Sequence, residues 1–193
     1  NQFFIRKFKA GKRTFVAEKN IMPAFCEARY FGYDKTGPEV QVPVKGQFLD
    51  AKSLLAHEEW SEVFDGGPLL LARLCPVDYH RYHFPDEGRI IESFPLHGKY
   101  HSVNPVALKE RPDIFATNER HVTILETENF GRLAYIEVGA MCVGKIVQSY
   151  PSINFERGDE KGYFLFGGST VIVIGEKGKW VPDQDLLDNT NKG

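Results

Sequence analysis

A serine directly behind two glycines is the residue most suggestive of chemistry in this chain. Ser169 follows Gly167 and Gly168, and it precedes the uninterrupted apolar run Val171-Ile172-Val173-Ile174. Glycine can adopt backbone angles that are closed to other residues, so a sharp turn can present the serine at the start of the run. A run without polar alternation is typical of a strand that is buried on both faces. Ser169 is therefore either a turn residue or a nucleophile.

Two histidines three positions apart form the second group of reactive side chains. They lie in the segment Asp78-Tyr79-His80-Arg81-Tyr82-His83, which ends at a proline. A metal site built on His80 and His83 would need a third ligand, and no nearby residue has suitable spacing. Two alternatives remain: polar residues at a strand end, or acid–base chemistry. Histidine suits the second because its ordinary pKa lies near neutrality.

The surroundings of Ser169 favour one kind of nucleophile over another. A carboxylate, a histidine and a serine are the parts of a catalytic triad, although sequence order alone does not assemble one. The GxSxG turn of lipase-type enzymes is absent, because Thr170 and Val171 follow the serine. A serine between a glycine turn and a buried strand is poorly placed to meet an external acyl substrate. It is well placed to attack the carbonyl of Gly168 behind it.

The elements that must position these groups are predicted to be mainly strands. Four apolar or alternating runs are typical of strands: residues 69–74, 89–94, 121–126 and 132–138. The last two flank the turn Asn129-Phe130-Gly131 and predict a hairpin. Residues 52–60 are the most helical segment. The tail from Pro182 is polar, and we expect it to fray.

A small apolar segment at residues 139–147 predicts strong curvature. Gly139 and Gly144 lie five residues apart in it, as in tightly curved barrel sheets. The chain has no internal repeat, low-complexity tract or convincing linker, so the sequence predicts a single domain over residues 1–193. We expect a mainly β (α+β) fold, a barrel-sandwich-like β domain with a few peripheral helices.

The composition argues against several classes of protein, among them nucleic-acid-binding, disulfide-rich and transmembrane proteins. The 24 basic and 26 acidic residues nearly balance at a net charge of −2, so nothing argues for nucleic acid. Cys26, Cys75 and Cys142 are far apart and odd in number, which favours reduced thiols over a zinc site or a disulfide framework. No apolar run approaches the roughly 18 residues of a transmembrane helix. The chain begins at Asn1 without Met, as expected of a fragment.

The first thirteen residues interleave aromatic and basic side chains. Phe3, Phe4 and Phe8 alternate with lysines and arginines across residues 1–13. Such a segment can form a surface helix that packs its phenylalanines inward and leaves its lysines in water. It can instead lie on an anionic membrane surface. Both interpretations stay open at this point.

Several short motifs in a fixed order resemble one known family. They are Gly167-Gly168-Ser169-Thr170, Asp78-Tyr79-His80-Arg81-Tyr82-His83, Ser102-Val103-Asn104-Pro105, Asn118-Glu119-Arg120 and residues 138–144. Val44-Lys45-Gly46 and the first seven residues are also similar. Each motif is weak alone, but together they resemble the phosphatidylserine decarboxylases nearly end to end.

The resemblance implies a proenzyme that cleaves itself. Ser169 would attack the carbonyl of Gly168, and the resulting ester would break by elimination to leave a pyruvoyl group at position 169. Residues 1–168 would form the larger chain and residues 169–193 the smaller one. The pyruvoyl carbonyl would condense with a substrate amine and act as the electron sink for loss of CO2, which PLP supplies elsewhere. No PLP, other diffusible cofactor or metal is required.

The resemblance also implies roles for individual residues. His83 would be the base that activates Ser169 and later the proton donor in decarboxylation. His80 would line the pyruvoyl pocket, and we place Tyr79 and the backbone near Val103 in the same pocket. Glu27 stands where the family has the aspartate of a triad, so it is either that third member or an ordinary surface acid.

The predicted function is a carboxy-lyase that converts phosphatidylserine to phosphatidylethanolamine and CO2. The same chemistry could decarboxylate a free amino acid, for example an aromatic one, because it needs only an α-amino carboxylate. A third hypothesis is an uncleaved, non-catalytic binding or carrier-like β domain. A lipid substrate would imply peripheral membrane association, and an amino acid a cytoplasmic protein. A homodimer is expected from the resemblance alone.

Overall fold

The computed structural model describes residues 2–9, 11–41, 48–111, 113–140, 145–165 and 169–192. The strands in these ranges are β1 (Arg29–Tyr33), β2 (Gly37–Gln41), β3 (Phe48–Leu49), β4 (Leu69–Leu74), β5 (Arg81–His83), β6 (Gly88–Leu96), β7 (Arg120–Thr127), β8 (Gly131–Val138), β9 (Lys145–Gln148), β10 (Asn154–Phe155), β11 (Glu160–Leu165) and β12 (Ser169–Gly175). The helices are α1 (Ala51–Leu55), α2 (Glu58–Phe64), α3 (Pro105–Glu110), α4 (Ile114–Thr117) and α5 (Gln184–Lys192).

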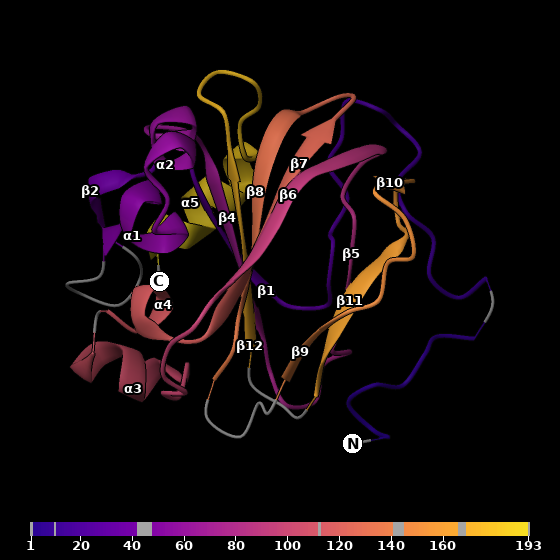
Figure 1. Cartoon of the computed structure of the whole chain (residues 1–193), viewed down its shortest axis with the longest axis horizontal. Helices are drawn as coiled ribbons and strands as arrows, with labels where there is room; N and C mark the ends of the chain where they lie inside the picture. The colour runs from indigo at the N-terminus through magenta and orange to yellow at the C-terminus, as the bar shows by residue number, and fades with distance from the viewer. Residues whose placement is uncertain are drawn as a thin grey trace.

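Strand β12 lies inside the largest sheet, which has seven strands in the order β1-β4-β12-β8-β7-β6-β10. It pairs antiparallel with β4 on one side and β8 on the other, and all seven of its residues are buried. Figure 1 shows this sheet in the middle of the molecule, with helices α1–α4 to one side and β5, β9 and β11 to the other. The buried strand predicted from the Val-Ile-Val-Ile run is confirmed.

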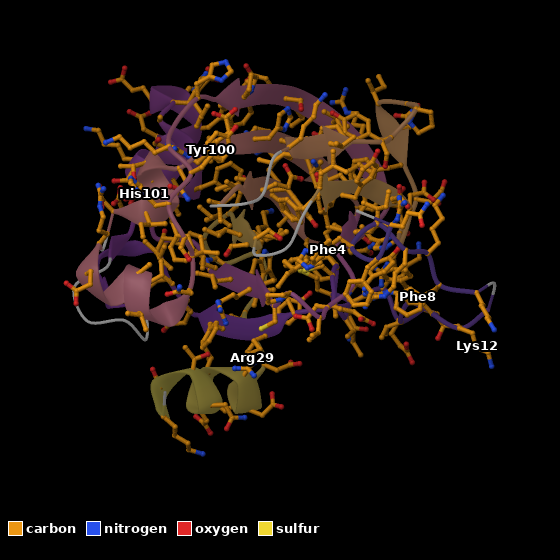
Figure 2. The ribbon with its side chains drawn as sticks, turned by 90° about the horizontal axis from the view of Figure 1, so that it is seen from below. Phe4, Phe8, Lys12, Arg29, Tyr100 and His101 are labelled. Atoms are coloured by element: carbon orange, nitrogen blue, oxygen red, sulfur yellow. The ribbon has the colours of Figure 1, made fainter. Side chains whose placement is uncertain are left out.

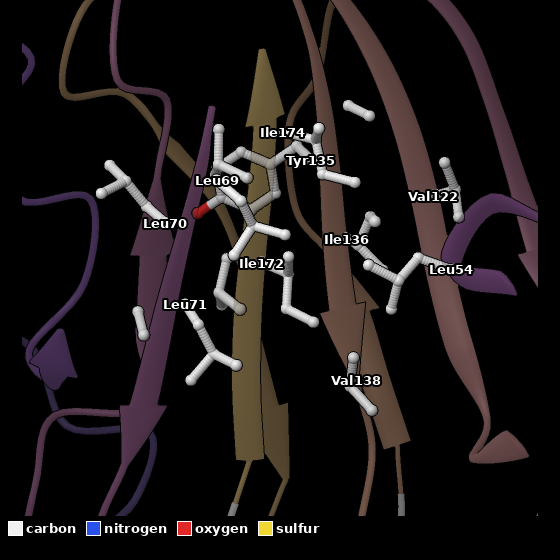
Figure 3. Close-up of a cluster of buried hydrophobic side chains, with 14 of the residues drawn as sticks. Leu54, Leu69, Leu70, Leu71, Val122, Tyr135, Ile136, Val138, Ile172 and Ile174 are labelled. Carbon is white, nitrogen blue, oxygen red and sulfur yellow. The ribbon is translucent and has the colours of Figure 1, made fainter. Parts of the chain in front are cut away.

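The core on the helix side of the sheet is built from alternate residues of the central strands. Ile172 lies in register between Leu71 and Ile136, and all three side chains are buried. Leu54 of α1 covers this face, as Figure 3 shows. Each fully buried aliphatic side chain contributes about 1.5–3 kcal/mol to the free energy of unfolding, so this face anchors β12 firmly.

A second, three-stranded sheet in the order β5-β11-β9 packs on the other face. Tyr82 of β5 and Tyr135 of β8 bring their ring centroids to 6.2 Å, and the Tyr135 hydroxyl donates to the carbonyl of His83 at 3.3 Å. The small sheet thus carries the histidine segment, while the large sheet carries Ser169. The active groups must meet across the space between the two sheets.

A fully buried ion pair joins the two sheets. The ammonium of Lys161 on β11 donates to the Glu137 carboxylate on β8 at 2.6 Å, to Gln148 Oε1 at 2.8 Å and to Thr123 Oγ1 at 2.9 Å. Lys161 and Glu137 have no exposed surface. Burial by itself would raise the pKa of the Glu137 carboxyl, but the Lys161 ammonium and His121 outweigh burial and hold that pKa below its ordinary value.

The fold prediction is confirmed in class and differs in detail. The described chain is mainly β with a few helices, and its strands form three sheets without a closed barrel. The strands expected at residues 69–74 and 89–94 and the hairpin around Asn129-Phe130-Gly131 are present. The helix expected at residues 52–60 is broken at Ala56, which has a left-handed backbone at φ 48°, so two short helices form.

Both termini differ from a structure considered in the sequence analysis. Of the two interpretations of the N-terminal segment, the surface helix is wrong for the described residues: residues 2–5 form a turn and residues 6–9 have no regular structure. The tail does not fray, because α5 packs on β1, where the Gly32 amide donates to Thr190 Oγ1 at 2.9 Å. Cys26 and Cys75 are free thiols, as expected. In the described chain, no helix is long and apolar enough to cross a membrane.

Some predictions concern residues outside the described ranges. These are the turn at Gly167 and Gly168, the third thiol at Cys142, the Val44-Lys45-Gly46 motif and the second half of the Gly139–Gly144 pair.

Candidate active site

Ser169 opens β12 and faces a histidine. It is completely buried, and its Oγ lies 3.3 Å from Nδ1 of His80. Ser169 pairs in register with Leu74, the last residue of β4, and the chain leaves β4 through a tight turn that ends at His80. The structure therefore brings a buried serine and a buried histidine into hydrogen-bonding distance.

A side-chain-capped turn sets the position of His80. The Asp78 carboxylate accepts from the Cys75 amide at 2.6 Å, and the Asp78 amide donates to the Cys75 carbonyl at 2.9 Å. Aspartate favours such turns because its side chain can replace a backbone acceptor. The ring of Phe4 packs edge-on against the imidazole at 5.3 Å between centroids. The hydrogen bonds of the turn and the contact with the Phe4 ring together orient the imidazole of His80.

The hydrogen bonds of His80 indicate its tautomer. Nε2 lies 3.1 Å from the carbonyl of Cys75, which can only accept, so Nε2 must carry the proton. In the neutral ring Nδ1 is then an acceptor, aimed at the Ser169 hydroxyl. Burial lowers the pKa of His80 below its ordinary value, which keeps the ring neutral at pH 7. A neutral acceptor at this distance is the arrangement that general-base catalysis needs.

His83 occupies a separate pocket on β5. Its Nδ1 lies 2.9 Å from the carbonyl of Gly158, and its Nε2 lies 3.2 Å from the Tyr79 hydroxyl. The Tyr79 and His83 rings are stacked at 5.9 Å, and Phe15 packs on the imidazole from another side at 5.2 Å. Burial lowers the pKa of His83 as well. In the described chain no hydrogen bond joins His83 to Ser169.

Glu27 does not meet either histidine in the described structure. Its side chain is 44% exposed and pairs with the Arg13 guanidinium at 3.5 Å. The hydrogen-bond acceptors of the two imidazoles are instead backbone carbonyls, those of Cys75 and Gly158. The proposed role of Glu27 as a third triad member stays a prediction.

The loop that holds Val103 is fixed by side chains from two other segments. Val103 is buried, and its carbonyl accepts from Nε of Arg73 at 3.2 Å. Asn118, which is fully buried, accepts from the His101 amide and donates to the carbonyls of His101 and Gly139. The Asn-Glu-Arg motif signalled Asn118, whereas nothing in the sequence signalled Arg73 or the carbonyl of Cys75.

The N-terminal segment lies over this end of the molecule. The Phe4 carbonyl accepts from the His80 amide at 3.3 Å, and the Ile5 carbonyl accepts from both Nε and Nη2 of Arg81. Figure 2, seen from below, places Phe4 near the middle of this end and Phe8 and Lys12 farther out. In the part of the chain that the structure describes, no group of three His, Cys, Asp or Glu side chains could hold a metal ion.

These features define a class of protein. A buried serine, already paired with a neutral histidine, follows two glycines and opens a central strand. Its nearest electrophile along the chain is the carbonyl of the preceding residue, so the site fits self-processing better than attack on an external ester.

Comparison with known proteins places the chain in one family. The family model described as phosphatidylserine decarboxylase matches residues 1–192. The chain is 42% identical to the phosphatidylserine decarboxylase proenzyme of Clostridium novyi (strain NT), with 100% of this chain and 66% of that protein covered. For the proenzymes of Clostridium tetani and Ruminiclostridium cellulolyticum the identities are 42% and 40%, with 100% of this chain and 65% of each protein covered. The chain therefore belongs to the phosphatidylserine decarboxylase family, which confirms the resemblance, and it spans about two thirds of the length of these relatives.

Proposed function

We propose that the chain is the catalytic part of a self-processing decarboxylase that converts phosphatidylserine to phosphatidylethanolamine and CO2. The observation that carries the proposal is the buried pair of Ser169 and His80, 3.3 Å apart, at a serine that directly follows Gly168. Membership of the family supports the same reaction. The hypotheses of an amino-acid decarboxylase and of an uncleaved binding domain have no comparable support.

Self-cleavage begins with proton transfer. Nδ1 of His80 takes the Ser169 hydroxyl proton while Oγ attacks the carbonyl carbon of Gly168. The imidazolium then returns this proton to the Ser169 nitrogen as the Gly168–Ser169 C–N bond breaks, which leaves an ester and a free amine. Loss of the Ser169 α-proton then expels the Gly168 carboxylate and leaves a dehydroalanine. Addition of water to its imine form releases ammonia and leaves the pyruvoyl group. The products are residues 1–168 and 169–193.

The smaller product stays in place because it begins with the most buried strand. Hydrogen bonds on both edges tie β12 to β4 and β8, and its side chains are buried on both faces of the sheet. The cut leaves these contacts intact. A newly formed group at position 169 would therefore remain beside His80.

The site residues fit a group formed from Ser169. The pyruvoyl group supplies a carbonyl that condenses with an amine and an electron sink for loss of CO2. His80 and His83 are both buried and neutral near pH 7, so either can hold or return a proton within the site. Tyr79 orients His83 through its hydroxyl, and the Phe4 ring shields His80 from water.

Peripheral contact with a lipid surface is part of the proposal. Phe3 and Phe8 are 55% and 39% exposed on the N-terminal segment, which also carries the exposed side chains of Lys7 and Lys9. Exposed aromatic and basic side chains together suit an anionic bilayer. The same segment lies against His80, so a bilayer bound here would present its headgroups near the site. The expected homodimer stays a prediction.

The test compares substrates and processing in one preparation. Phosphatidylserine vesicles and free amino acids are each incubated with the purified chain, and CO2 release is measured while intact-mass spectrometry follows cleavage. We expect the wild-type chain to be cleaved and to release CO2 from the vesicles but not from free amino acids. The Ser169→Ala chain should neither be cleaved nor release CO2. Release from free amino acids alone would contradict the lipid substrate. A wild-type chain that never splits would favour a binding domain.

A further inference from the structure

A row of polar side chains crosses the large sheet one register step from Ser169. Thr170 of β12 lies opposite Arg73 of β4, and Arg73 lies opposite Arg29 of β1. Directly opposed residues on antiparallel strands project to the same face. Because successive residues alternate between faces, this is the face away from the Ser169 side chain. The row thus reaches the backbone of position 169 from the side opposite to His80.

The two arginines of this row have like charges and no acidic partner among the side chains that the structure describes. Neither forms an ion pair with any of these, the acids of α5 on β1 included. Like charges directly opposite destabilise a sheet, and a partly buried cation without an anion adds a desolvation cost. Among the described side chains, no anion offsets either effect at Arg29 and Arg73.

The third member of the row is an unsatisfied hydroxyl. Thr170 has no exposed surface, and its Oγ1 has no hydrogen-bond partner among the described residues. Buried hydroxyls are rarely left without one, so such a group signals a ligand or a strained site. The guanidinium of Arg73 is held nearby by the Val103 carbonyl at 3.2 Å and Cys75 Sγ at 3.7 Å.

The row also runs from the surface inward. Arg29 is exposed, Arg73 is half-buried and Thr170 is completely buried. Figure 2 shows Arg29 between the strand ribbons and helix α5. Neighbouring strands are about 4.8 Å apart, so the three backbones span about 10 Å. An anion could enter past Arg29 and be held by Arg73.

We propose that Arg73, with Arg29 and the Thr170 hydroxyl, forms a binding site for the phosphodiester group of the substrate headgroup. The inference rests on the proposed function, because it names the part of the lipid that this side of the site recognises. Arginine suits the task because its planar guanidinium binds two phosphate oxygens at once. The Thr170 hydroxyl would donate the additional hydrogen bond that it now lacks.

The chemistry of the reaction selects the phosphodiester over the substrate carboxylate. The carboxylate loses its charge as CO2 departs, so an arginine bound to it would stabilise the ground state more than the transition state. The phosphodiester keeps its charge throughout the reaction. Binding it stabilises both states equally, which lowers KM and leaves kcat unchanged.

Steady-state kinetics of two variants test the site. Arg73→Gln and Thr170→Val are compared with wild type on phosphatidylserine vesicles, after intact-mass spectrometry has established that each is cleaved. We expect KM to rise about tenfold or more in Arg73→Gln, as for loss of a charged hydrogen bond, with kcat changed less than threefold. Thr170→Val is the sharper variant, because it removes a hydroxyl without a partner: a purely structural role predicts unchanged kinetics, and the anion site predicts a raised KM.

A matched control and a binding measurement separate the outcomes. Arg89→Gln removes an arginine of β6 that is paired with Glu126 of β7, and the KM of this variant should equal that of wild type. Titration of the uncleaved Ser169→Ala chain with a short-chain phosphatidylglycerol and with inorganic phosphate gives affinity without catalysis. The lipid should bind more weakly to Arg73→Gln in that background, whereas an effect on inorganic phosphate alone overturns the assignment to the headgroup.

Three further results would overturn the proposal, and a fourth would refute only the proposed function. Unchanged KM in cleaved Arg73→Gln and Thr170→Val contradicts it. Slower cleavage at unchanged KM would assign the row to the new carboxylate at Gly168 instead. Equal lipid affinity of Ser169→Ala chains with and without Arg73 contradicts it in the absence of catalysis. A wild-type chain that neither splits nor releases CO2 refutes the proposed function, and the titration still decides the anion site.

Discussion

Removal of the Lys161 ammonium is the perturbation whose magnitude the structure defines best. Lys161→Met keeps the length of the side chain but deletes a charge that donates to three acceptors at 2.6–2.9 Å. Glu137 then remains fully buried with one amide donor, Gln148 Nε2 at 3.0 Å, and with His121 at 3.7 Å. Removing one partner of a buried ion pair costs about 3–5 kcal/mol.

The assay is chemical denaturation in a Ser169→Ala background, where the chain stays in one piece and unfolding is unimolecular. We expect Lys161→Met to lower the free energy of unfolding by about 3–5 kcal/mol. The second variant, Lys161→Met with Glu137→Leu, removes the stranded carboxylate and should recover most of the loss. Because the pKa of Glu137 is lowered in the fold, its contribution is complete above its ordinary pKa of 4.5 and is lost as pH falls through its folded value. The parent with the intact pair should therefore lose stability more steeply in acid than the double variant.

Two results would refute this reasoning. A loss below about 1 kcal/mol in Lys161→Met would mean that the pair contributes no more than an exposed ion pair. A double variant as unstable as the single one would mean that the ammonium acts through packing rather than by neutralising Glu137. In either case neutralisation of the buried Glu137 carboxylate would not be the contribution that Lys161 makes to stability.

The remaining predictions concern cleavage and are all read by intact mass. His80→Ala should slow cleavage at least 100-fold, as expected for loss of a general base, while His83→Ala should still be cleaved; the reverse order would assign the base to His83. Because burial lowers the pKa of His80 and the base must be neutral, the cleavage rate should fall to half its maximum only at a pH below 6.5, the ordinary pKa of histidine; a rate that already halves at pH 7 would contradict this. Glu27→Asp should leave the rate within about twofold, since Glu27 contacts Arg13 rather than a histidine; a clear acceleration would support the triad assignment.

The parts of the fold that could be predicted from the sequence are those that a short local pattern of residues specifies. The apolar run of β12 and the turn between β7 and β8 specify a buried strand and a hairpin without reference to the rest of the chain. The α5 helix could not be predicted, because its polar sequence is held by tertiary contacts with β1, among them the packing of Leu186 and the hydrogen bond from the Gly32 amide to Thr190.

The candidate site also contains groups that the sequence indicates and groups that it does not. The side chains of Ser169, His80 and His83 carry a signal in their types and spacing, and the structure places the first two together. The groups that orient the histidines are carbonyl oxygens, which every residue has, so the sequence cannot distinguish Cys75 or Gly158. Pairs such as Lys161 and Glu137 come together only when two sheets pack, and no spacing rule indicates them.

The most direct test of the central claim is the intact mass of the purified wild-type chain after incubation. We expect two species that divide between Gly168 and Ser169, residues 1–168 and residues 169–193, with the smaller blocked by a pyruvoyl group at its first position. We also expect both species to elute together under native conditions, because β12 stays paired with β4 and β8. A single mass of 193 residues after prolonged incubation, or a cut at any other bond, would contradict self-cleavage at Ser169.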